Sequence, residues 1–210
     1  MLLLSINVSA DTKTKEFKID TPKGFTEVYR LENLSKAAKI LGMSDGELSE
    51  FLKKNEITYF AVSNDKSTQI RLSGVEDNFG KTVGEMNNLN NKQLKDLIKT
   101  LKKESTAKFS IDTSNGRNYI KSSSLLKDSG GEYTVTQYIT VVNGKTYYLT
   151  CYNSGTKTSG EIKSVFSNLI IYDVLNKTDN IKYIIGFLIV ALMLISVGLI
   201  VGIYKKIKVK

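Results

Sequence analysis

The chain has 210 residues and a formal net charge of +9, from 30 lysine and arginine and 21 aspartate and glutamate side chains. It contains no histidine, which removes the commonest general base and metal ligand, and its one cysteine, Cys151, excludes an internal disulfide framework. Nearly all basic side chains are lysines, whereas phosphate recognition favours arginine, so we expect no nucleic-acid partner. We also expect no metal and no cofactor.

The first ten residues, MLLLSINVSA, form a short apolar run that ends in small side chains. Small residues at the last and third-last positions resemble a signal-peptidase site, so residues 1–10 are predicted to be a truncated signal peptide. A basic segment before the apolar run is missing, and a first β-strand or a disordered start is the alternative.

Residues 11–175 are predicted to form one α+β domain. Its first half begins with two strands around a turn at 21–25, where proline and glycine favour chain reversal. The expected elements are strands at 16–20 and 26–30, a helix capped by Asn33 and ended by Gly42, a helix that runs from the capping box at 44–47 to Asn55, strands at 57–63 and 69–73, and a loop at 74–90.

The second half of the domain begins with the clearest amphipathic helix, capped by Asn90 or Asn91. Its apolar stripe contains Leu94, Leu97, Ile98 and Leu101. The remaining expected elements are strands at 108–113 and 117–122, a hairpin over 133–153, a helix at 159–168 and a strand at 169–174.

The hairpin is centred on Asn143-Gly144, a pair typical of type I′ turns. This turn pairs Val142 with Lys145 and Tyr138 with Leu149. Side chains alternate along a strand, so each face of the hairpin carries large apolar groups, and helices are expected on both sides of the sheet. One face carries Tyr138, Tyr147 and Leu149, and the other carries Val135, Ile139, Val141, Tyr148 and Tyr152.

Residues 183–204 contain no charged side chain and are long enough for a transmembrane helix. A linker at 176–182 precedes them, and a basic cytoplasmic tail at 205–210 follows. The lysines of the tail predict a single-pass, type I protein in the cell membrane, with the domain outside and the C-terminus cytoplasmic. The spacing of Gly198 and Gly202 permits close helix packing and a weak homodimer.

The order of these elements, with the motifs Pro22-x-Gly24-Phe25 and Gln137-Tyr138…Asn143-Gly144-Lys145, resembles the PsbP/Mog1-like family. The resemblance covers about residues 15–175 and is greatest to extracytoplasmic members from low-GC Gram-positive bacteria. It implies an α/β/α sandwich, in which an antiparallel sheet has helices packed on both faces. It also implies a binding or assembly module without a shared catalytic centre.

Two groups of side chains are candidate binding surfaces. Tyrosines on the hairpin suit a peptide or glycan if they are exposed, and otherwise pack in the core. Lysines on the helix after Asn90 suit acidic lipid headgroups, and otherwise form an ordinary solvated face. The ligand-binding candidates are Tyr138, Tyr147, Tyr148 and Tyr152, and the membrane-surface candidates are Lys92, Lys95, Lys99, Lys102 and Lys103.

Catalytic patterns are weaker. Three Ser-x-x-Lys pairs match a hydrolytic dyad, but a chain this rich in serine and lysine produces such pairs by chance. Acidic pairs and loop oxygens that could bind calcium lack the required spacing, and we expect them to lie on the solvated surface. These patterns are Ser63/Lys66, Ser105/Lys108, Ser124/Lys127, Glu47/Glu50, Glu76/Asp77, and Asp77 with Asn78 and Glu85.

The sequence therefore predicts a non-catalytic, membrane-anchored extracytoplasmic binding or assembly module. Its expected partners are membrane lipid and an envelope or membrane protein. The alternative is a cell-envelope hydrolase that uses a Ser-Lys or carboxylate pair.

Overall fold

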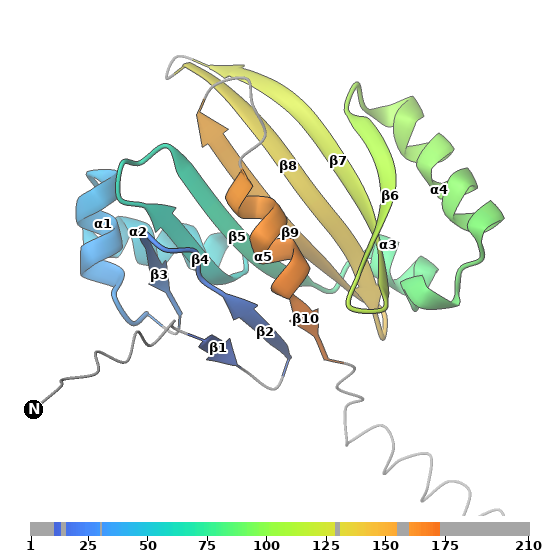
Figure 1. The fold of residues 1–210 in the computed structure, drawn as a ribbon, viewed down its shortest axis with the longest axis horizontal. Coiled ribbons are helices and arrows are strands. Elements are labelled where there is room, and N and C mark those ends of the chain that lie inside the picture. Colours follow the sequence, from blue (N-terminus) through green and yellow to red (C-terminus); the bar gives the residue numbers. More distant parts are fainter. Residues whose placement is uncertain (1–10, 14–15, 30, 129–130, 155–159, 173–210) are drawn as a thin grey trace, which may run out of the picture. The chain divides into compact units, whose positions relative to one another are not determined.

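Seven antiparallel strands form the main sheet in the order β3-β4-β5-β9-β8-β7-β6 (Figure 1). The computed structural model describes residues 11–13, 16–29, 31–128, 131–154 and 160–172. The strands of the main sheet are β3 (Phe25–Val28), β4 (Ile57–Ser63), β5 (Thr68–Val75), β6 (Lys108–Ser114), β7 (Arg117–Asp128), β8 (Gly131–Val142) and β9 (Lys145–Ser154).

A second sheet has three strands in the order β1-β2-β10. They are β1 (Asp11–Lys13), β2 (Phe17–Asp20) and β10 (Ile170–Ile171). Within β2 the side chains alternate, and Phe17 and Ile19 are buried. β10 pairs with β2 through Ile171 and Phe17, so the two ends of the described domain meet in this sheet.

The helices cover the main sheet in three separate groups, each over its own apolar cluster. On one face, α5 and the three-stranded sheet enclose the largest cluster. On the other face, α1 and α2 pack over β3 and β4, while α3, η1 and α4 pack toward β6–β9 (Figure 1). Their bounds are α1 (Leu34–Leu41), α2 (Asp45–Lys54), α3 (Asn78–Val83), the 3-10 helix η1 (Met86–Asn88), α4 (Asn91–Glu104) and α5 (Gly160–Asn168).

Local signals set several helix ends where the sequence predicts them. Ser44 and Glu47 form a reciprocal capping box at the start of α2, and Gly42 ends α1 in the left-handed conformation. The Asn90 side chain caps α4 by accepting from two backbone N–H groups. Asn33 precedes α1 as expected, but it is itself left-handed and its side chain makes no capping hydrogen bond.

The hairpin prediction is confirmed in register and in the division of its faces. Val142 pairs with Lys145, and Tyr138 pairs with Leu149. Tyr138, Tyr147 and Leu149 belong to the cluster under α5, whereas Ile139, Val141 and Tyr148 belong to the cluster near α4.

The predicted fold class, one antiparallel sheet between helices followed by a transmembrane helix, is wrong. The described residues form an α+β fold rich in antiparallel sheet, with five α-helices and a second sheet. In the second sheet, β2 pairs with β1 and β10 and not with β3, and this arrangement buries Phe17 and Ile19 against α5. A sandwich of one sheet between helix layers does not contain this sheet.

No helix among the described residues is both long enough and apolar enough to cross a membrane. The expected signal peptide at 1–10, the linker at 176–182, the span at 183–204 with Gly198 and Gly202, and the tail at 205–210 lie outside the described residues. The membrane location and the topology derived from them are not tested and stay predictions.

The expected loop at 74–90 is also wrong, because α3 and η1 lie within it. Asp77 caps α3 by accepting from the Gly80 N–H at 2.6 Å, and Glu85 caps η1 by accepting from Asn87. These turns are too short to show helical periodicity in the sequence. The packing of Met86 and Phe79 beneath α4 stabilises them instead.

Candidate functional site

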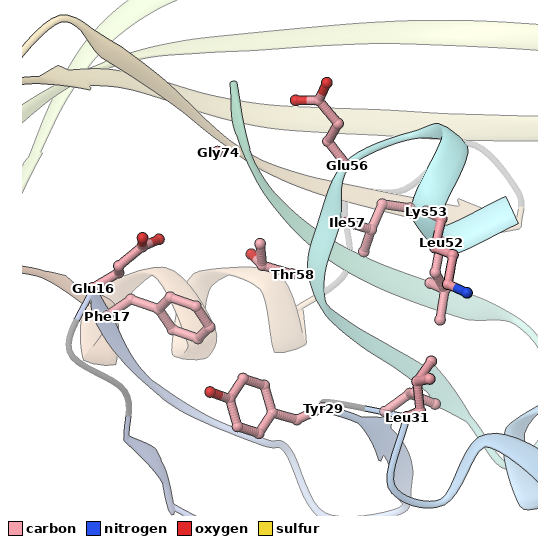
Figure 2. A pocket seen from close by; sticks show the side chains of 11 residues that line it. Glu16, Phe17, Tyr29, Leu31, Leu52, Lys53, Glu56, Ile57, Thr58 and Gly74 are labelled. Carbon is pink, nitrogen blue, oxygen red and sulfur yellow. The ribbon is translucent and has the colours of Figure 1, made fainter. Parts of the chain in front are cut away.

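A concave cavity of about 640 Å³ opens where β2 of the second sheet faces the end of β3 and the start of β4 (Figure 2). We call it the Phe17 cleft. β2, β3, α2, β4 and β5 all contribute to its wall, so residues far apart in the chain meet there. The lining residues are Glu16, Phe17, Val28, Tyr29, Leu31, Leu52, Lys53, Glu56, Ile57, Thr58 and Gly74.

The walls of the cleft are mainly apolar. Phe17 and Tyr29 pack edge to face, with ring centroids 6.2 Å apart and planes at 87°. Figure 2 shows these two rings on one side of the cavity, with Leu31 and Leu52 on the other. Leu52 is buried, while Leu31 exposes 48% of its surface and so leaves an apolar group at the mouth. An apolar ligand can therefore contact side chains that are already held in place by the core.

Charged side chains surround the mouth rather than the floor. The Glu16 carboxylate accepts from Lys145 Nζ at 3.2 Å, and Lys145 also lies over the Tyr147 ring. Gly74 makes room for this lysine, since a Cβ there would lie 2.8 Å from Lys145 Cε. Lys53 and Glu56 complete the polar rim.

Two non-glycine residues of the cleft have a left-handed backbone, Leu31 with φ 67° and Glu56 with φ 51°. Glu56 follows the Asn55 cap of α2 and occupies the position that glycine usually takes after a helix. A side chain in this conformation costs about 1–2 kcal/mol. Four other non-glycine residues of the described chain, Asn33, Lys66, Asn115 and Asn143, share this conformation, so the two rim positions mark strained turns and do not by themselves indicate a function.

The four predicted ligand-binding tyrosines are divided between the two faces of the sheet. Tyr138 and Tyr147 are buried in the core, where Tyr138 stacks on Phe166 with ring centroids 3.8 Å apart. Burial raises the pKa of both phenols to about 12. Tyr148 and Tyr152 are half-buried on the opposite face and line a smaller groove of about 290 Å³ with Arg71.

The predicted lysine surface lies on α4. All five lysines are exposed, and Lys99 pairs with Asp96 at 3.1 Å. Their contact with a membrane surface is not tested and stays a prediction. The lysines concerned are Lys92, Lys95, Lys99, Lys102 and Lys103.

The weaker catalytic patterns have other partners in the structure. The Ser63 hydroxyl donates to Asp65 at 2.6 Å, and Lys127 pairs with Glu132. Glu47 belongs to the capping box of α2, and the calcium candidate Glu85 pairs with Arg117. Within the described part of the chain, no group of three or more acidic or cysteine side chains is arranged to hold a metal ion.

Sequence reasoning missed the Phe17 cleft. The sequence predicts Phe17 and Ile57 only as strand residues, and Tyr29 and Leu31 as the end of a strand and its connection. No local pattern marks these residues as neighbours, because they come from separate helices and strands that meet only in the folded protein.

Comparisons with known proteins give no family. No family model matches the chain, and no curated protein matches it. The chain is similar to a crystal structure from Bacteroides thetaiotaomicron VPI-5482, solved at 1.50 Å resolution, with a TM-score of 0.45 and 16% sequence identity. The match covers 74% of this chain and 45% of that one. The resemblance to the PsbP/Mog1-like family is not tested by these comparisons and stays a prediction.

Proposed function

We propose that the protein is a non-catalytic binding module whose ligand is a small apolar molecule held in the Phe17 cleft. One observation carries the proposal, which is the presence of an apolar cavity of about 640 Å³ with a polar rim. Sites for small molecules in proteins have volumes of about 300–1,000 Å³ and are lined mainly by apolar and aromatic groups.

The walls of the cleft supply the binding energy in this proposal. Burial of apolar surface contributes about 0.8 kcal/mol per methylene group. Phe17 and Leu52 are nearly fully buried before any ligand enters, so they lose little side-chain entropy on binding, and the area newly buried comes mainly from the ligand itself and from the exposed Leu31. Leu31 at the mouth is the side chain that can close over a ligand.

In this proposal the charged side chains of the rim have no catalytic role. The Glu16 carboxylate is engaged by Lys145, and Lys53 and Glu56 are exposed side chains at the end of α2. The hydrolase alternative draws no support from a specific observation, because its Ser-Lys and carboxylate pairs lie outside this cleft.

The test is a fluorescence titration of the full chain with the apolar dye 1-anilinonaphthalene-8-sulfonate. The chain has no tryptophan, so the dye signal is read without indole emission. The variant Thr58→Phe places a ring in the cleft, where Thr58 is an exposed strand residue whose hydroxyl donates to the Leu72 carbonyl at 3.0 Å. We expect saturable binding to the unmodified protein and at least tenfold weaker binding to this variant.

Thr113→Phe is the matched control. Thr113 is also an exposed strand threonine with one hydroxyl hydrogen bond, to Asn118, but it lies on β6 away from the cleft. Its substitution is expected to leave the dye affinity unchanged. Equal affinities of the two variants would contradict the proposal, as would a stoichiometry far above one dye per chain.

A further inference from the structure

Arg71 lies in the middle of the main sheet, on the face that the helices cover only at its two ends. Arg71 pairs with Thr150 across β5 and β9, and Thr150 pairs with Gln137 across β9 and β8. α1 and α2 pack toward β3 and β4, and α3 and α4 pack toward the other edge, so this polar row forms the floor of a groove between them. We call it the Arg71 groove.

Two aromatic rings hold the guanidinium group. Its central carbon lies 4.7 Å from the Phe51 ring centroid and 4.1 Å from the Tyr152 ring centroid. Such cation–π contacts orient a guanidinium and exclude water from its faces. The arginine is therefore kept in one position at the floor of the groove.

The positive charge of Arg71 has no anionic partner among the described residues. Its side chain donates to Gln69 Oε1 at 2.7 Å, and its buried Nε has no hydrogen-bond partner. Burial lowers the pKa of Arg71, which reflects the cost of removing the charge from water. A half-buried charge without a counterion destabilises a fold, and an anion supplied by a ligand would offset that cost.

The other lining side chains identify the kind of anion. The rest of the lining consists of neutral hydrogen-bonding groups, aromatic surface and two aliphatic side chains. These are Asn55, Ser73, Gln137 and Thr150, then Tyr148 and Tyr152, and then Val75 and Ile57, of which Ile57 also lines the Phe17 cleft. A phosphate group carries about −1.5 to −2 charges and would be only partly neutralised by one arginine. A carboxylate carries one charge, and its two oxygens match the planar guanidinium.

We propose that the Arg71 groove binds the carboxylate group of a small polar organic acid. Its volume of about 290 Å³ lies just below the usual range for ligand sites, which limits the ligand to a small molecule. Gln137 donates from Nε2 to the Thr150 hydroxyl at 2.9 Å, which orients both groups along the floor. Their remaining hydrogen-bonding capacity can hold hydroxyl groups of the acid. This site is separate from the apolar ligand of the Phe17 cleft, so either proposal can fail alone.

The experiment follows the Nε–H signals of arginine by NMR in the full chain. Arg117 is an internal control, because it is paired with Glu85 at 2.9 Å and its side chain is similarly shielded. The probes are acetate, D-lactate and D-glucuronate, with D-glucose as the uncharged analogue and inorganic phosphate as the other anion. We expect at least one carboxylate to shift the Arg71 signal in a saturable way, to leave the Arg117 signal in place, and to bind at least tenfold more tightly than phosphate.

Arg71→Lys tests whether the planar guanidinium is needed to bind the carboxylate, since lysine keeps the charge but loses the planar pair of donors. Binding of the best carboxylate is expected to weaken at least tenfold, with the unfolding midpoint measured alongside it. If this variant does not fold, the NMR titration of the unmodified protein alone tests the proposal. A shift with no carboxylate, equal shifts of Arg71 and Arg117, binding of glucose equal to that of glucuronate, or tighter binding of phosphate would each overturn the proposal.

Discussion

The phenol of Tyr148 donates a 2.8 Å hydrogen bond to the carboxylate of Asp77, from the second strand of the hairpin to the start of α3. Thr146 and the Gly80 N–H donate to the same carboxylate, each at 2.6 Å. The Asp77 side chain therefore caps α3 and also links it to the hairpin by hydrogen bonds. This contact explains why a segment that resembles a loop in sequence is helical.

Replacing Asp77 with asparagine should lower the free energy of unfolding by about 1–2 kcal/mol at neutral pH, after discounting for solvent access, since hydrogen bonds to charged groups are stronger than neutral ones. Burial raises the pKa of Asp77, but the hydrogen bonds from Thr146, Gly80 and Tyr148 outweigh it, and the pKa lies below its usual value. The stabilisation is thus present above the unfolded pKa and is lost as the pH falls through the folded pKa.

Urea unfolding at neutral and acidic pH measures this effect. The difference between the two proteins should shrink as the pH falls below about 4, the ordinary pKa of an aspartate. Asp96→Asn is the control, because Asp96 pairs only with Lys99 on the exposed face of α4 and should contribute about 0.3 kcal/mol. A difference at Asp77 that does not vary with pH would contradict the assigned role.

Gly80→Ala should destabilise the protein by about 2–3 kcal/mol, because backbone atoms leave no space for a methyl group. A Cβ at Gly80 would lie 2.4 Å from the Gly144 carbonyl oxygen and 2.7 Å from Thr146 Oγ1. In contrast, a Cβ at Gly46 in α2 meets nothing within 4 Å. Gly46→Ala should therefore stabilise the protein by about 0.5–1 kcal/mol. Thermal unfolding distinguishes the two, and a neutral Gly80→Ala would refute the close packing of α3 on the hairpin turn.

Leu31→Gly should lower the free energy of unfolding by about 1–2 kcal/mol less than Leu125→Gly does. Only Leu31 has a left-handed backbone, and glycine adopts this conformation without strain. Both leucines expose 48% of their surface, so the two substitutions remove similar contacts. Chemical denaturation of both variants gives the difference directly. Equal losses of stability would show that the rim of the Phe17 cleft stores no strain.

Alkaline pH should unfold the protein through its buried tyrosines. Burial raises the pKa of Tyr119, Tyr138 and Tyr147 to about 12, against about 10 for an unfolded tyrosine. The folded pKa is the higher one, so this stabilisation is complete below pH 10 and is lost as the pH rises toward 12.

Phenolate absorbance and circular dichroism, followed together over this pH range, check the alkaline transition. Ionisation of the buried tyrosines should coincide with unfolding, and Tyr147→Phe should move the transition to higher pH. Full ionisation near pH 10 with the fold intact would count against the burial of these rings.

Contacts within short stretches of chain are the part of this fold that the sequence predicts well. The capping box of Ser44 with Glu47, the Asn90 cap and the Asn143-Gly144 hairpin depend on residues a few positions apart. The two faces of the hairpin follow from alternation once the turn is located. The sequence also separates the buried Tyr138 from the half-buried Tyr148, although it does not say which face is open.

Contacts between distant segments were decided only by the tertiary structure. The pairing of β2 with β10, which creates the second sheet and one wall of the Phe17 cleft, joins residues from opposite ends of the domain. The Arg71 groove likewise depends on the part of the main sheet that α1 and α2 on one side, and α3 and α4 on the other, leave uncovered. Neither arrangement has a local signal, because periodicity records which side of an element is apolar and not which element will cover it.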